Sequence, residues 1–196
     1  KFFIKNVINV LFIVISFMAL STHTQAAGPK RILIMMSSES ALGLSGKLTG
    51  TWFEEVATPY YTLREAGYEV VLASLKGGEA PIDLLSMQAP FTTKNTARFS
   101  SDLVAMHALK HTNRLSDLNY NDYDAVFFPG GYGLLWDLTN DSHTIKMIED
   151  FFYAGKPIAL VCHAPAILRD AKKKNGQPLV KGLTVTGFMN AEDEVA

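Results

Sequence analysis

The chain has 196 residues, of which 48% are hydrophobic, and its formal net charge at pH 7 is −1. This length and composition are sufficient for one globular domain with a single core. Nucleic acid is not an expected partner, because phosphate recognition needs concentrated lysine and arginine, and the chain has no basic run beyond Lys172–Lys174.

The first residues predict an export signal. Two lysines precede an apolar run from Val7 to Leu20, which is followed by small and polar residues that end in "TQAA". This succession is typical of a secretory signal peptide, with cleavage expected after Ala26. The apolar run is shorter than the roughly 20 residues of a membrane-spanning helix, so a retained anchor is the less favoured alternative. We therefore expect a signal peptide, residues 1–26, and a periplasmic or extracellular domain, residues 27–196, with no stable membrane association after cleavage.

Five short apolar runs in the remaining chain predict strands. In chain order they are Arg31–Met36, Glu69–Ser74, the apolar part of "YDAVFFPGGYG", "PIALVC" and "LTVTGF". Each run is apolar throughout rather than at every second residue, which is typical of strands that are covered on both faces.

Four segments between these strands have helical patterns. Residues 51–68 repeat apolar side chains at three- and four-residue steps, with Pro59 as a kink and Gly67 as the stop. The other three helical segments are "SSDLVAMHALKHT" with Ser100 or Ser101 as its cap, the stretch from Asp141 or Ser142 to Gly155, and "APAILRDAKKK".

Strands that alternate with helices predict a doubly wound, mostly parallel α/β sheet sandwiched by helices, of the flavodoxin-like type.

The only cysteine, Cys162, lies at the carboxyl end of a predicted strand, where such a sheet binds its ligands. The stretch "IALVCHAPAIL" predicts a strand, a one-residue corner and a helix, which is the arrangement of a nucleophile elbow. Backbone amides at a helix N-terminus lower the pKa of a thiol, and His163 is adjacent. A buried structural cysteine is the alternative, but the corner and the neighbouring histidine favour a reactive thiol.

Four motifs in this chain resemble those of one known superfamily. They are "TGTWFEEVATPYY", "FFPGGYG" followed by "WDL", "ALVCHAPAIL" and "VTGFMNAEDE". With them the chain is similar to the ThiJ/PfpI superfamily of the class I glutamine amidotransferase-like fold, in the spacing of its glyoxalase III and heat-shock-chaperone branch. The resemblance extends over nearly all of the chain after the signal, and the superfamily hosts several activities. Its members continue further at the C-terminus, so we expect the domain to be C-terminally incomplete.

The resemblance implies a nucleophile and an acid. It makes Cys162 the nucleophile, with His163 beside it, and it makes Glu55 the buried acid that shares a proton with the thiol. Glu54 is then expected to point to solvent. Two exposed carboxylates at a helix start are the alternative for this acidic pair.

The "PGG" turn is expected to contribute to the same site. It offers the backbone N–H groups of Gly130 and Gly131 at a strand end, which suits an oxyanion hole. The resemblance assigns the next residue, Tyr132, to substrate binding, at a position where the family often has histidine.

A further acid is expected near the end of the chain. Family members usually have their third catalytic residue after "GF", where this chain offers Glu192, Asp193 and Glu194. Counting from Gly187 favours Asp193.

The expected activity is that of a cysteine-dependent, glutathione-independent glyoxalase, a lyase of the D-lactate dehydratase class that turns methylglyoxal into lactate or repairs related dicarbonyl and glycation damage. A stress-related holdase chaperone or a redox sensor with an oxidisable cysteine is one alternative, and a cysteine peptidase or amidohydrolase is another. No cofactor is expected, and the partner is a small reactive aldehyde or dicarbonyl, with a homodimer left open. His107 and His111 have metal-ligand spacing without a third ligand nearby, so no metal is predicted.

Overall fold

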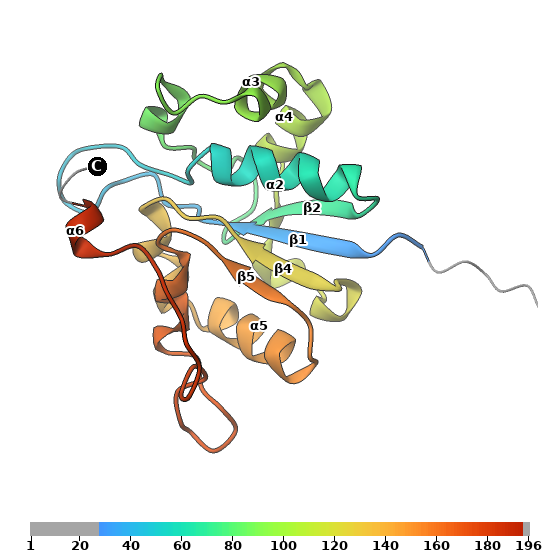
Figure 1. Cartoon of the computed structure of the whole chain (residues 1–196), viewed down its shortest axis with the longest axis vertical. Helices are drawn as coiled ribbons and strands as arrows, with labels where there is room; N and C mark the ends of the chain where they lie inside the picture. The colour runs from blue at the N-terminus through green and yellow to red at the C-terminus, as the bar shows by residue number, and fades with distance from the viewer. Residues whose placement is uncertain (1–27, 194–196) are drawn as a thin grey trace, which may run out of the picture.

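The computed structural model describes residues 28–193, so the expected export signal and Glu194 lie outside it. In the described chain five parallel strands form one sheet, in the order β3-β2-β1-β4-β5 (Figure 1). The doubly wound, parallel α/β fold expected from the sequence is confirmed. The strands are β1 (Arg31–Met36), β2 (Glu69–Ser74), β3 (Asn113–Arg114), β4 (Ala125–Phe128) and β5 (Ile158–Leu160).

Helices lie on both faces of this sheet (Figure 1). One face carries α2 (Glu54–Glu65), α3 (Lys94–Ser101) and α4 (Leu103–Lys110), and the other carries α5 (Ser142–Tyr153). Within residues 28–193 no helix is both long and apolar enough to cross a membrane. The remaining elements are the 3₁₀ turns η1 (Leu84–Met87), η2 (Leu115–Asp117), η3 (Tyr120–Asp122), η4 (Gly133–Leu135), η5 (Leu138–Asn140) and η6 (Ala164–Arg169), and the one-turn helix α6 (Asn190–Asp193).

Strand β1 contributes to both hydrophobic cores, because its side chains alternate between the two faces of the sheet. Leu33 and Met35 belong to the core that contains α5 and η6, whereas Ile34 and Met36 belong to the core of α2, α3 and α4. All four side chains are fully buried. Burial of one such side chain contributes about 1.5–3 kcal/mol, so β1 is held firmly from both faces up to its carboxyl end.

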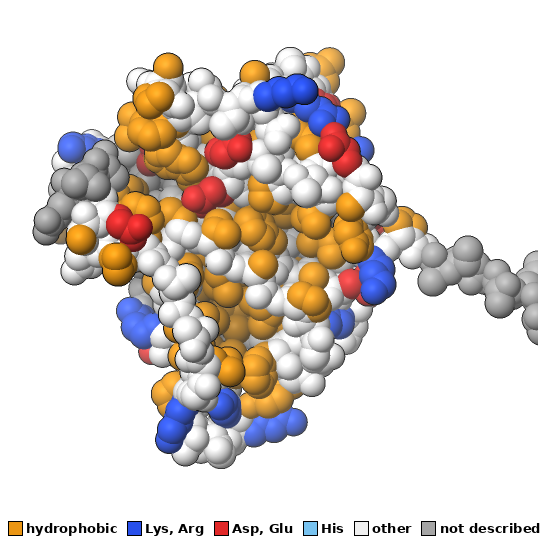
Figure 2. All heavy atoms as spheres, viewed as in Figure 1, with side chains coloured by type: hydrophobic (Ala, Val, Ile, Leu, Met, Phe, Trp, Pro, Cys, Tyr) orange, Lys and Arg blue, Asp and Glu red, His pale blue; other side chains and the backbone are white. Residues whose placement is uncertain are grey.

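Strand β5 departs from the expectation that every strand is covered on both faces. It lies at the edge of the sheet, and its three residues are exposed or only half-buried. Hydrophobic side chains reach the surface between α2 and α5 (Figure 2), where Phe127, Pro157 and Ala159 line a cavity of about 300 Å³. The apolar composition of β5 would suit the interior of a sheet, but its edge position leaves these side chains half-covered.

The helix predicted from "SSDLVAMHALKHT" begins at a different residue, because two helices meet there. Asp102, rather than Ser100 or Ser101, caps α4 by accepting hydrogen bonds from two backbone N–H groups of its first turn. The preceding helix α3 was not predicted. It starts with a capping box between Thr93 and Thr96, which lacks the usual glutamate or glutamine and is therefore a weak sequence signal.

Two predictions near the C-terminal end are wrong. The segment "APAILRDAKKK" forms only the turn η6, and beyond it the backbone N–H of Lys172 donates to the side chain of Glu149 on α5. The segment "LTVTGF" has no strand partner within the described chain. Leu183 and Val185 in this segment are 57% and 55% exposed, since no neighbouring strand covers them.

A partly buried carboxylate holds the carboxyl end of β1 against the turns that follow β4. Asp137 accepts hydrogen bonds from the Ser37 hydroxyl at 2.9 Å, the Ser38 backbone N–H at 2.7 Å and the Leu138 backbone N–H at 2.6 Å. Burial raises the pKa of Asp137, and the three donors act against that rise. One side chain therefore ties the carboxyl end of β1 to the turns that follow β4.

Removal of this carboxylate should destabilise the fold. In Asp137→Ala the three donors lose their acceptor, so we expect the free energy of unfolding to fall by about 1–3 kcal/mol. Asp137→Asn keeps one acceptor oxygen and should lose less. Urea titrations of both variants and of the parent protein measure the difference. Equal stability of the alanine variant and the parent would show that this contact does not hold the strand ends.

Candidate active site

Cys162 occupies a strained corner directly after β5. Its backbone φ is +56°, and among the described residues other than glycine it alone has a positive φ. Such a conformation costs about 1–3 kcal/mol in a residue with a side chain and occurs preferentially at functional sites. The next residues form η6, so the chain turns sharply at the thiol, in the elbow geometry expected from the sequence.

Glu55 lies in the first turn of α2 and reaches the thiol. Its carboxylate accepts a hydrogen bond from the Gly130 backbone N–H at 2.6 Å and another from the Cys162 thiol. Burial raises the pKa of Glu55, and these two hydrogen bonds reduce the rise. Gly130 permits the approach, because a Cβ atom there would lie 2.4 Å from that of Cys162. The start of α2, the turn after β4 and the corner after β5 therefore meet at one point.

The thiol and the carboxyl group of Glu55 titrate as a pair. Burial raises the pKa of Cys162 to about 11, and the negative charge of Glu55 adds to the rise, whereas the backbone N–H groups of Gly131 and His163 reduce it. This value applies when Glu55 is ionised, because a neutral carboxyl group exerts no such repulsion. The sequence predicts a thiol more acidic than free cysteine, whereas in this geometry burial and the charge of Glu55 raise its pKa. The turn η6 assists little, because it is a 3₁₀ turn of six residues rather than a long helix.

His163 connects the thiol to an acid. Its Nδ1 lies 3.2 Å from Cys162 Sγ, and its Nε2 lies 3.1 Å from Oδ1 of Asp193 on α6. The imidazole is buried, and the rings of Tyr132 and Phe188 lie against it, each with 4.5 Å between ring centroids. An acid at one ring nitrogen fixes the orientation of the ring and the tautomer at the other nitrogen.

The acid beside His163 is Asp193, which the count from "GF" favours. The same Oδ1 atom of Asp193 also accepts a hydrogen bond from the Tyr132 hydroxyl at 2.9 Å. Burial and this hydrogen bond raise the pKa of Tyr132 to about 12, so the phenol remains a donor. Glu192 instead accepts a hydrogen bond from a backbone N–H of its own turn, and Glu194 lies outside the described residues.

The amide donors of the site differ from the expected pair. The Gly130 N–H is not free for an oxyanion, because it donates to Glu55. The N–H groups of Gly131 and His163 face the Cys162 sulfur. These two groups are therefore the ones that can donate to an oxygen atom on a carbon bound to that sulfur.

Glu54 does not simply point to solvent, as the sequence led us to expect. Its carboxylate accepts hydrogen bonds from the hydroxyl groups of Thr58 on α2 and Thr93, which caps α3. Glu54 therefore ties the starts of two helices together. Of the two adjacent acids, Glu55 is the one that contacts the thiol.

A cavity of about 490 Å³ opens beside the thiol. Sequence reasoning missed the apolar part of its wall. Trp52 belongs to the "TGTWFEE" motif, but nothing in the sequence marks Leu85 or Phe91, which come from the stretch between β2 and α3. The residues that line the cavity are Trp52, Glu55, Leu85, Phe91, Gly131, Tyr132, Cys162, His163, Phe188 and Glu192.

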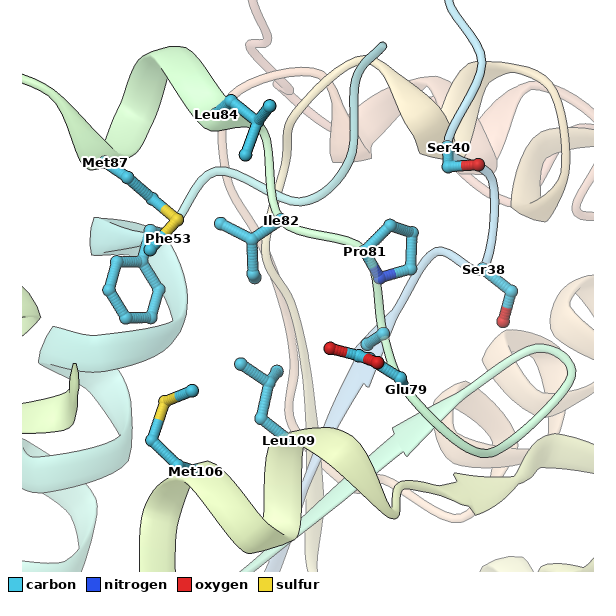
Figure 3. Close-up of a pocket in the computed structure, with 11 residues that line it drawn as sticks. Ser38, Ser40, Phe53, Glu79, Pro81, Ile82, Leu84, Met87, Met106 and Leu109 are labelled. Atoms are coloured by element: carbon cyan, nitrogen blue, oxygen red, sulfur yellow. The ribbon is translucent and has the colours of Figure 1, made fainter. Parts of the chain in front are cut away.

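A second cavity, of about 470 Å³, contains no nucleophile (Figure 3). It lies between the loop after β1, the segment before η1, and α4. Apolar side chains gather at one end of it, against the core of α2, α3 and α4. The side chains labelled there include Phe53, Ile82, Met87, Met106 and Leu109, with Ser38, Ser40 and Glu79 toward the other end.

The histidine pair on α4 does not form part of a larger ligand set. The rings of His107 and His111 stack with 4.2 Å between centroids, and Nδ1 of His111 lies 2.9 Å from the His107 carbonyl oxygen. Across residues 28–193 no group of three His, Cys, Asp or Glu side chains is arranged so that it could hold a metal ion.

The shared proton predicts a two-step reaction of Cys162 with iodoacetamide. One proton leaves the pair first, and the second leaves only towards pH 11, where both groups become ionised. Alkylation of the folded protein should therefore rise in two steps as the pH increases. In Glu55→Gln the carboxylate charge is absent, so the pKa of the thiol should fall below about 11 and a single step should remain.

The rate of alkylation, followed by intact mass from mildly acidic to strongly alkaline pH, measures these steps. One step near pH 11 in both proteins would contradict the shared proton. Reaction only after denaturation would show that Cys162 is an inaccessible core residue. Glu54→Gln is the matched control and should keep both steps, because Glu54 does not contact the thiol.

Comparison with known proteins gives this geometry a family context. A family model described as DJ-1/PfpI family matches residues 49–196. The chain is 31% identical to Glyoxalase 3 of Candida albicans over 169 residues, which cover 85% of this chain and 71% of that protein. It is 28% identical to the glutathione-independent glyoxalase HSP31 of Saccharomyces cerevisiae, over 85% of this chain and 72% of that protein.

Solved structures give the same result. The crystal structure of glyoxalase III from Candida albicans matches with a TM-score of 0.76 at 30% identity, and the match covers 85% of this chain and 71% of that chain. The X-ray structure of Rapid Encystment Protein 24 KDa from Francisella tularensis matches with a TM-score of 0.79 at 31% identity, covering 85% and 73%. The glyoxalase III resemblance seen in the sequence motifs is thus supported by relatives in both sequence and structure.

Proposed function

This chain belongs to the DJ-1/PfpI family, and we propose that it is a glutathione-independent glyoxalase that converts methylglyoxal or a related 2-oxoaldehyde into a 2-hydroxy acid. The observation that carries the proposal is the contact between the Cys162 thiol and the Glu55 carboxylate at the wall of a cavity. Such a pair can add a nucleophile to an aldehyde and take up its proton. Relatives named glyoxalase are 28–31% identical to this chain over most of its length.

The first step is addition of sulfur to the aldehyde carbon. The S–C bond forms as the thiol proton passes to Glu55, whose raised pKa suits it to hold that proton. The electron pair of the carbonyl bond moves onto oxygen. The N–H groups of Gly131 and His163 face the sulfur and can donate to that oxygen. Protonation of the oxygen gives a hemithioacetal on Cys162.

The second step transfers hydrogen between adjacent carbons. A base removes the proton from the former aldehyde carbon while the ketone oxygen is protonated, which gives an enediol. Protonation of the former ketone carbon and loss of a hydroxyl proton then give a thioester of the 2-hydroxy acid. His163 is placed for this role, because it lies beside the sulfur and Asp193 orients its ring. Glu55 is the alternative base, once it has passed the thiol proton to the alkoxide oxygen of the hemithioacetal.

Hydrolysis of the thioester completes the cycle. Water attacks the acyl carbon, the S–C bond breaks, and the thiol of Cys162 regains its proton. One water molecule is consumed overall. The aldehyde carbon is oxidised and the ketone carbon is reduced, so the electrons balance within the substrate.

Loss of the nucleophile or of its proton acceptor should abolish turnover. For Cys162→Ala and Glu55→Gln we expect kcat to fall by at least about a hundredfold, because the addition step loses one of its two partners. Glu54→Gln is the control and should stay within about twofold, because Glu54 binds only threonines. Formation of lactate from methylglyoxal without glutathione is the measurement.

Each unexpected outcome has a definite meaning. Equal losses in Glu54→Gln and Glu55→Gln would show that the start of α2 matters and not the proton acceptor. Lactate formation by Cys162→Ala at the parent rate would refute the proposal. Suppression of aggregation by a protein that consumes no dicarbonyl would favour the holdase alternative.

Tyr132→Phe tests whether the tyrosine positions the His163–Asp193 pair. The variant keeps the ring against His163 but loses the hydroxyl group that donates to Asp193. We expect kcat to fall by about two- to tenfold, the value of one hydrogen bond, with a smaller change in KM. Steady-state kinetics with methylglyoxal separate the two parameters. A raised KM with unchanged kcat would instead assign Tyr132 to substrate binding alone.

A further inference from the structure

We infer that the cavity beside Cys162 accepts a 2-oxoaldehyde whose ketone carbon carries a bulky apolar substituent, best an aromatic ring. This inference rests on the proposed function and names its substrate class. Methylglyoxal has only a methyl group at that position. The cavity measures about 490 Å³, which is within the range of sites that hold ligands far larger than three carbons.

The apolar part of the wall is shaped by aromatic side chains. Trp52, just before α2, and Phe91, just before α3, pack edge to face with their ring centroids 5.1 Å apart. Phe91 and Leu85 on η1 remain 38% and 45% exposed, so part of their apolar surface is open to a ligand. An aromatic substituent would bury this surface and can add a further edge-to-face contact, whereas a methyl group would cover little of it.

The charges of the wall require a neutral substituent. Glu55 and Glu192 bring carboxyl groups to the cavity, and among the described residues no lysine or arginine lines it. A phosphate or carboxylate group on the substrate would meet acids and find no cation as a partner. Size, apolar character and charge therefore favour the same class, a neutral aryl or large alkyl 2-oxoaldehyde.

The test compares phenylglyoxal with methylglyoxal, using the chain in its present length. Addition of one water molecule converts phenylglyoxal into mandelate, as it converts methylglyoxal into lactate. We expect a higher kcat/KM for phenylglyoxal, and we expect Trp52→Ala and Phe91→Ala each to lower the ratio of the two kcat/KM values by about tenfold. Comparing this ratio between variant and parent removes two unwanted effects. The intrinsic reactivity of the two aldehydes is the same for both proteins, and a lower folded fraction of a variant lowers both of its kcat/KM values equally. Mandelate is quantified directly, so that reaction of the aldehyde with arginine side chains does not count as turnover.

Phe152→Ala is the matched control. Phe152 is 39% exposed, about as much as Phe91, but it lies near the end of α5, before the amino end of β5, whereas Cys162 follows the carboxyl end of that strand. The Phe152→Ala variant should leave the ratio of the two kcat/KM values unchanged. Methylglyoxal turnover without a preference for phenylglyoxal, or equal ratios in Phe91→Ala and Phe152→Ala, would overturn the inference and leave the proposed function intact. Turnover of neither aldehyde would overturn the proposed function itself.

Discussion

The hydrogen bond between the Cys162 thiol and the Glu55 carboxylate is the contact on which the site depends. The two residues are far apart in the chain, and each is placed by a different element: Glu55 by the first turn of α2 and Cys162 by the corner after β5. They meet because parallel strands end at one edge of the sheet, where the turn after β4 also arrives. Gly130 in that turn must lack a side chain for the contact to form, and its N–H group fixes the carboxylate.

The second half of the site is held less firmly. His163 is buried between rings, but the side chain of Asp193 is 37% exposed and belongs to a segment without a strand partner in the described chain. Three contacts anchor that segment at the site: the Phe188 backbone N–H donates to the Cys162 carbonyl oxygen at 2.9 Å, the Tyr132 hydroxyl donates to Asp193, and Nε2 of His163 lies 3.1 Å from the same Asp193 oxygen. Tyr132 therefore supports an acid that the backbone alone constrains weakly, which is a positioning role rather than a chemical one.

The pattern of hydrophobic residues within a segment was sufficient to predict β1, β2, β4, α2 and α5, because in each of them that pattern alone determines which side chains are buried. It failed where contacts between distant segments decide the structure. The backbone N–H of Lys172 donates to Glu149 on α5, and no strand of residues 28–193 pairs with residues 183–188. In the site, the fold brings together the four side chains that the resemblance indicates, namely Cys162, His163, Glu55 and Asp193. Three features of the site could not be predicted, because each arises between segments that are remote in sequence. They are the hydrogen bond from the Gly130 N–H to Glu55, the threonine hydroxyl groups around Glu54 and the apolar part of the cavity wall.

The apolar wall and the thiol–carboxyl pair are two consequences of the same burial. Removing water from this region raises the pKa of Glu55 and of Cys162, so the site disfavours two negative charges and retains a proton between the pair. A neutral apolar substituent that entered the cavity would exclude more water and strengthen this preference. It would also strengthen the hydrogen bonds that the Gly131 and His163 N–H groups donate to a developing oxyanion, because a lower local dielectric makes such bonds stronger. A charged substrate would gain neither effect, since it would carry its own hydration into the cavity or lose it without a compensating cation.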